Sequence, residues 1–171
     1  MRLSTALDLR AVAALALALA AAQPAGAATQ TATVNATVVK PLAIRWLQDL
    51  DLGSVTLGPG TWSNAAVALS RGGTFTCANA NVTCSGATQV AKYNVSGSNN
   101  QTVRISAPNV TLVNQSNPAQ TLTLVPDSPA TVVLTSSGPP GVDFPIGGSI
   151  TLSSSTAAGL YTGTFNVTVD Y

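Results

Sequence analysis

The sequence GLYTGTFNVTVDY, residues 159–171, is the stretch that decides the fold of this chain. From Phe165 onward, apolar and polar residues alternate without interruption, which is the two-residue period of a β-strand with one buried face. β-Branched and aromatic residues fill the stretch, and they suit a pleated, half-buried surface. We therefore predict a core strand of a β-sandwich whose inner face carries Phe165, Val167, Val169 and Tyr171.

A second stretch with the same period, Thr29–Val39, lies near the other end of the chain. Pro41 ends it, because proline has no N–H to donate to a strand ladder. We predict a first strand here, with threonines and an asparagine on one face. The opposite, apolar face carries Ala32, Val34, Ala36 and Val38.

Between these two stretches, short alternating segments are separated by turns rich in Gly, Pro and Asn, and no helical period occurs. Turn signals at this spacing indicate an all-β fold, an immunoglobulin-like antiparallel β-sandwich of about 7–10 short strands. The segment Ser136–Gly148 is especially rich in Pro and Gly. We predict that it is the longest loop, exposed and tolerant of insertions.

The first 27 residues have the order of regions found in a secretory signal peptide. Arg2 and Arg10 flank the start, the apolar run Ala11–Ala22 follows, and small residues surround Ala27. The apolar run is shorter than the roughly 20 residues that a membrane-spanning helix needs. We predict a cleaved signal peptide over 1–27 and a single domain over 28–171, exported to the periplasm, cell surface or medium. An uncleaved N-terminal anchor is the alternative.

Charged residues make up 8% of the chain, and histidine is absent. Of the seven basic and six acidic side chains, removal of Arg2, Arg10 and Asp8 with the signal leaves five of each. A neutral surface has no electrostatic footprint for nucleic acid. Every acidic residue is Asp, so neither imidazole nor glutamate is available for acid–base catalysis. We predict a protein that is not an enzyme and uses no cofactor or metal.

Two residue pairs are the candidates for chemistry. Asp49 and Asp51 share a face of a predicted strand, so they fit a cation site or an acid pair, but a polar strand start is the preferred interpretation. Trp46 and Trp62 fit a sugar-stacking platform, although packing is the more usual role of tryptophan in a sandwich. We expect no catalytic or ligand-binding site from either pair.

The chain has two cysteines, Cys77 and Cys84, and both lie in the exported part. Export and close spacing across a turn predict a disulfide between them. A redox or metal pair is the alternative, but zinc usually requires four ligands.

Two parts of the chain resemble a known group of proteins. Thr31–Val39 with the step Leu50-Asp51-Leu52-Gly53 resembles the opening of spore-coat-protein-U-type secreted domains. The ending Ala158–Tyr171 resembles the end of the same group, and still more that of a related family of small secreted Gram-negative domains of unknown function. Both groups are similar to chaperone–usher pilins, which are sandwiches completed by a strand from the next subunit.

This resemblance implies a structural subunit of a surface pilus or fimbria-like polymer, assembled by donor-strand complementation and serving adhesion or biofilm formation. Thr29–Val39 would be the donor strand, and the C-terminal assembly strand would include Gly159 and Tyr171, which are twelve residues apart (171 − 159). The implied partners are copies of itself or related subunits, with a periplasmic chaperone and an outer-membrane usher as candidates. The alternative is a self-complete secreted β-sandwich that binds an unknown ligand.

Overall fold

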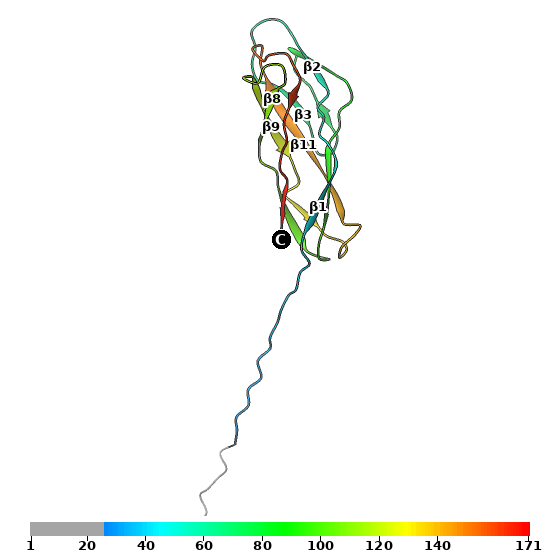
Figure 1. Cartoon of the computed structure of the whole chain (residues 1–171), viewed down its shortest axis with the longest axis vertical. Helices are drawn as coiled ribbons and strands as arrows, with labels where there is room; N and C mark the ends of the chain where they lie inside the picture. Colours follow the sequence, from blue (N-terminus) through cyan, green and yellow to red (C-terminus); the bar gives the residue numbers. More distant parts are fainter. Residues whose placement is uncertain (1–25) are drawn as a thin grey trace, which may run out of the picture. The chain divides into compact units, whose positions relative to one another are not determined.

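The computed structural model describes residues 26–171, and this part of the chain contains thirteen strands and no helix (Figure 1). The predicted all-β, antiparallel architecture is confirmed. Thirteen strands replace the predicted seven to ten because several are only two or three residues long. They are β1 (Ala43–Gln48), β2 (Ser54–Leu57), β3 (Ala65–Leu69), β4 (Phe75–Thr76), β5 (Val82–Ser85), β6 (Ala91–Ser96), β7 (Thr102–Ser106), β8 (Val110–Asn114), β9 (Thr121–Asp127), β10 (Thr131–Val133), β11 (Val142–Leu152), β12 (Tyr161–Thr162) and β13 (Thr168–Asp170).

The chain divides into two parts, residues 1–37 and residues 38–171, which are described separately. The predicted signal peptide, 1–27, lies outside the described residues except for its last two. Residues 26–37 are exposed and carry no strand, and the side chain of Val34 is 89% exposed. The predicted first strand is therefore not formed in the described structure.

The second part contains a large sheet with the strand order β1-β6-β11-β9-β8-β12, and β3 and β4 extend it beside β11. Its longest strand, β11, pairs with β6 through its first half and with β3 and β9 through its second half. Buried residues alternate along both halves of β11, so this strand forms the centre of the fold.

The prediction of an exposed loop over Ser136–Gly148 is wrong for the second half of this segment. Only residues 136–141 lie outside β11, whereas Gly147 and Gly148 are buried within it. A Cβ atom on Gly147 would collide with the backbone of Leu69 and Arg71. Glycine is therefore required here for close approach of two strands, a role that looks like a turn signal in the sequence.

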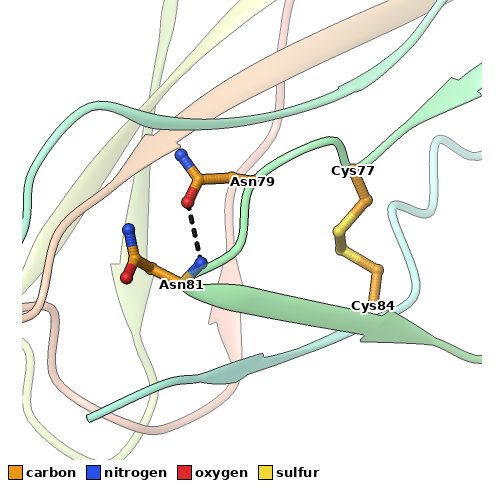
Figure 2. Close-up of a disulfide and its surroundings, with 4 residues drawn as sticks. All are labelled: Cys77, Asn79, Asn81 and Cys84. Atoms are coloured by element: carbon orange, nitrogen blue, oxygen red, sulfur yellow. Dashed lines mark hydrogen bonds between the residues drawn. A yellow bond between two sulfur atoms is a disulfide. The ribbon is translucent and has the colours of Figure 1, made fainter.

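A small sheet with the order β10-β7-β13 and a two-stranded ribbon of β2 and β5 complete the domain. One core cluster contains Val95, Val103, Leu134 and Phe144, and a second contains Val67, Leu124 and Leu152. The predicted disulfide between Cys77 and Cys84 is present, and it closes the loop that leads into β5 (Figure 2). Within this loop the amide of Asn81 donates a 2.9 Å hydrogen bond to Oδ1 of Asn79.

The C-terminal stretch is divided between the two sheets. β12 pairs with β8 in the large sheet, and β13 pairs with β7 in the small sheet. The five residues Gly163–Val167 belong to neither strand. Half-buried and exposed residues alternate from Phe165 to Asp170 as predicted. The prediction of a core strand is wrong, however, because the stretch lies at a sheet edge and crosses from one sheet to the other (the red segment ending at C in Figure 1).

Candidate functional site: an apolar groove along the open edge

A groove of about 1120 Å³ runs along the domain between two segments that are distant in sequence. Asp49–Leu57 forms one wall and Ala157–Phe165 forms the other. Its floor is apolar and comes from the large sheet, with Leu112, Leu122, Leu124, Ile150 and Leu152 as the lining residues. We refer to this feature as the groove.

Side chains on the inner face of the large sheet become more exposed toward its edge strand β1. Trp46 pairs with Tyr93, which in turn pairs with Phe144, so these three aromatic side chains form a row across β1, β6 and β11. Phe144 is 2% exposed, Tyr93 is half-buried and Trp46 is 60% exposed. Because all three side chains point to the same face, the increase in exposure means that no residue in 26–171 fully covers this face at the edge of the sheet.

Side-chain exposure also increases toward the sheet edge in a second pair of residues on β6 and β1. Ile44 pairs with Val95, which is fully buried, yet Ile44 is 37% exposed. Within the described part of the chain, β1 pairs with β6 alone, so its other edge is open. An open edge presents unpaired N–H and C=O groups that can accept another strand.

The opposite wall contains a stretch that has the sequence period of a strand but forms no strand. Phe165 is half-buried and contacts Tyr93 edge-on, with ring centroids 6.3 Å apart. Its backbone lies in the stretch Gly163–Val167, which belongs to no strand although its sequence has the period of one. This wall of the groove therefore includes main-chain groups that belong to no strand within the described part of the chain.

Polar groups lie at the mouth of the groove. The indole Nε1 of Trp46 donates to Oδ1 of Asp49 at 3.0 Å. Burial, and secondarily the nearby Asp49 carboxylate, raises the pKa of Tyr93 above 10.0, so its hydroxyl is neutral at physiological pH. Asp51 accepts a 2.8 Å bond from the amide of Gly53 and precedes β2, which begins at Ser54.

Trp62, the other tryptophan that the sequence offered for ligand stacking, has a structural role. Nε1 of Trp62 donates to the carbonyl oxygen of Gly58 at 3.1 Å, and the ring packs on the second core cluster. Residues 26–171 contain no group of three or more His, Cys, Asp or Glu side chains arranged to hold a metal ion.

Asn114 organises one end of the groove, and the sequence analysis did not identify it. This side chain is fully buried at the end of β8. Its Nδ2 donates to the carbonyl oxygen of Ala158 at 3.1 Å, and its Oδ1 accepts from the amides of Ser116 and Asn117. Gly159 has a φ of 146° and lies against this amide, with no room for a Cβ atom. The only signal in the sequence is an asparagine at the end of an alternating segment.

Three residues outside the groove lining are joined by hydrogen bonds, and we call them the clamp: Lys40, Ser98 and Tyr171. The hydroxyl of Tyr171 donates to the carbonyl oxygen of Lys40 at 2.6 Å and accepts from the amide of Ser98 at 2.9 Å. The amide of Lys40 donates to Oγ of Ser98 at 2.6 Å. Gly97 leaves space for the Tyr171 hydroxyl, which a Cβ atom would occupy.

The structure places the predicted assembly residues along this edge. Gly159 and Phe165 line the groove, Val167 and Val169 pack on the first core cluster, and Tyr171 forms the clamp. Val38 is 90% exposed. Ala32, Val34 and Ala36 lie in the first part of the chain and are exposed. Their role as a donor strand stays a prediction.

The fold and the groove define an antiparallel all-β domain in which β1 is an edge strand with an exposed inner face. Residues 42–171 match the family described as Domain of unknown function (DUF4402), and the chain belongs to this family. A comparison with curated proteins finds no match. Residues 26–171 include no helix long and apolar enough to cross a membrane.

Proposed function

We propose that the protein is a structural subunit of a surface pilus or fimbria-like polymer, in which the segment Thr29–Val39 of one copy fills the groove of another. We call this segment the arm. The observation that carries the proposal is the uncovered inner face of β1 opposite Gly163–Val167, a stretch with a strand period but no strand partner. Strand addition at such an edge obtains affinity from main-chain hydrogen bonds and specificity from alternate side chains.

The arm is long enough for the groove. The arm runs from Thr29 to Val39, ten residues apart (39 − 29), and the groove wall runs from Ala157 to Phe165, eight residues apart (165 − 157). At about 3.3 Å per residue, they would span roughly 33 Å and 26 Å in an extended conformation. One arm would therefore cover the length of this wall.

The arm also agrees with the groove in chemistry. It contains no charged residue, so its insertion over an apolar floor buries no unpaired charge. Burial of Val34 and Val38 would contribute roughly 1.5–3 kcal/mol each before the cost of ordering the arm. The alternating threonines would remain on the solvent side, where their hydroxyl groups can bind water.

Assembly of this kind fits export across the inner membrane and a location in the periplasm or at the cell surface. The partners would be copies of this chain or related subunits, and a periplasmic chaperone and an outer-membrane usher are candidates for delivering them. A self-complete secreted binding module, in which the arm fills the groove of its own domain, is the competing function.

A peptide titration tests this proposal. The acceptor is the compact part, residues 38–171, carrying Trp62→Phe so that Trp46 is its one tryptophan. A peptide of residues 29–39 should shift the emission of Trp46 to shorter wavelength, because it covers an indole that is 60% exposed. It should also raise the melting temperature by mass action.

Two peptide variants give a matched comparison. Val34→Asp places a charge over the apolar floor and should abolish binding. Thr33→Asp places the same charge on the solvent face and should retain it. Equal binding by both variants, or no binding by the natural peptide, contradicts the proposed function.

A further inference from the structure

The two walls of the groove are held in different ways. The wall formed by Ala157–Phe165 includes β12, which pairs with β8 of the large sheet. The wall formed by Asp49–Leu57 includes β2, which pairs with β5 alone, and within residues 26–171 β5 has no other strand partner either. The position of this second wall over the floor therefore depends on what holds the ribbon of β2 and β5.

The disulfide between Cys77 and Cys84 holds the middle of this ribbon (Figure 2). Cys84 lies in β5 and pairs directly with Val55 of β2, which lines the groove. Cys77 follows β4 directly, and both cysteines pack against the second core cluster. The disulfide therefore connects the strand neighbour of a groove-lining residue to the end of β4.

Two strand pairs lead from β4 to the floor of the groove. β4 pairs with β3, and β3 pairs with the second half of β11. In that second pair, Val67 lies opposite Ile150 and Ala65 lies opposite Leu152. Ile150 and Leu152 belong to the floor. The disulfide is thus a cross-link between the strands that carry the floor and the ribbon that carries the wall.

Other contacts hold the two ends of the ribbon. Beyond Leu57, the carbonyl oxygen of Gly58 accepts a 3.1 Å bond from Nε1 of Trp62. Before β2, Asp51 and Gln89 exchange two main-chain bonds of 2.8 Å. Without the cross-link we expect the middle of the ribbon to lose order, so that an incoming strand would have to order the wall as it binds.

We propose that this disulfide positions the β2 wall, so that the groove accepts an arm only after Cys77 and Cys84 have been oxidised. This inference rests on the proposed function. The oxidant would be a disulfide-bearing molecule of an oxidising compartment: its S–S bond is reduced to two thiols while the two cysteine thiols form one S–S bond, which balances protons and electrons. A chain in a reducing compartment would therefore carry an arm but no receptive groove.

The test measures arm binding by the chain of residues 28–171 carrying Val34→Asp, whose own arm should not compete for the groove. A fluorescein-labelled peptide of residues 29–39 with the natural sequence reports binding by anisotropy. We expect the oxidised chain to bind, and the double variant Cys77→Ser with Cys84→Ser to bind at least about tenfold more weakly. Reduction of the oxidised chain with dithiothreitol should weaken binding equally, and reoxidation should restore it.

A matched variant separates this effect from a general loss of stability. Val103 is fully buried in β7, outside the groove lining. Val103→Ala in the oxidised chain should lower the melting temperature but keep the peptide affinity within about twofold, at a temperature where all the chains are folded. In the double variant, amides paired between β2 and β5 should exchange at least about tenfold faster, while those of β11 keep their protection.

The outcomes distinguish this inference from the proposed function. Equal peptide affinity for the oxidised chain and the double variant overturns the inference and leaves the function standing. Equal weakening by Val103→Ala, or loss of protection in β11 of the double variant, also overturns it, because the disulfide would then stabilise the whole domain rather than the wall. An oxidised chain that does not bind the peptide overturns both.

Discussion

Asn114 and Tyr171 join distant parts of the domain through side-chain bonds to the main chain. Asn114 bonds to Ser116 and Asn117 in the turn after β8 and to Ala158 before β12, whereas Tyr171 joins the C-terminal end to Lys40 and Ser98. The alternation of the last strand placed Tyr171 on the inner face, but its hydrogen bonds join residues that are 131 and 73 positions apart. Such bonds depend on the folded topology, so no local pattern could predict the clamp or the role of Asn114.

Replacement of Asn114 should be among the most destabilising polar substitutions in the domain. Asn114→Ala removes the bonds of a fully buried amide to Ala158, Ser116 and Asn117 and leaves these part-buried main-chain groups without their partner. We expect a loss of roughly 2–4 kcal/mol in the free energy of unfolding, measured by urea denaturation. Gln115→Ala removes an exposed amide from the next position and should cost less than about 1 kcal/mol. Equal costs would contradict the structural role assigned to Asn114.

At the scale of elements, a clean period identified the faces of a segment but did not by itself give a strand, since Thr29–Val39 forms none, and the prediction also failed where glycine or proline serves packing. Alternation from Phe165 identified the inner face of the last stretch correctly. It could not show that the stretch crosses between sheets, because strand partners depend on the whole fold. In β11, Pro145 pairs with Lys92, and Gly147 and Gly148 allow close approach to β3 and the side chain of Leu124. These three residues resemble loop formers, which is why the central strand was predicted as a loop.

Two insertions test whether β11 is a central strand, as the structure has it, or part of an exposed loop. A short Gly-Ser tag after Gly138 lies in the exposed segment that precedes the strand and should leave the melting temperature within a few degrees of the wild type. The same tag after Gly147 interrupts the pairing of β11 with β3 and β9, and the domain should not fold. Circular dichroism of the two purified chains measures the difference. A folded protein with the tag after Gly147 would show that β11 is not central.

At the scale of the whole molecule, the domain has an edge strand, β1, with exposed inner-face side chains, and the chain also has an exposed segment with the period of a strand. Exposed inner-face residues such as Trp46 and Ile44 are a liability for a free monomer with little surface charge. They are suitable for a subunit whose edge is covered on assembly. The sequence suggested the arm and the last strand, but only the fold shows that a groove lies beside the latter.

The central claim is that the arm adds a strand along Gly163–Val167. Amide hydrogen exchange of residues 38–171, measured with and without the peptide of residues 29–39, tests it most directly. The amides of Gly163–Val167 should exchange rapidly in the free domain and should become protected when the peptide binds, because they would then donate to a strand partner. The Val34→Asp peptide should leave them unprotected. Protection already present without peptide, or rapid exchange that persists at saturating natural peptide, would contradict the account.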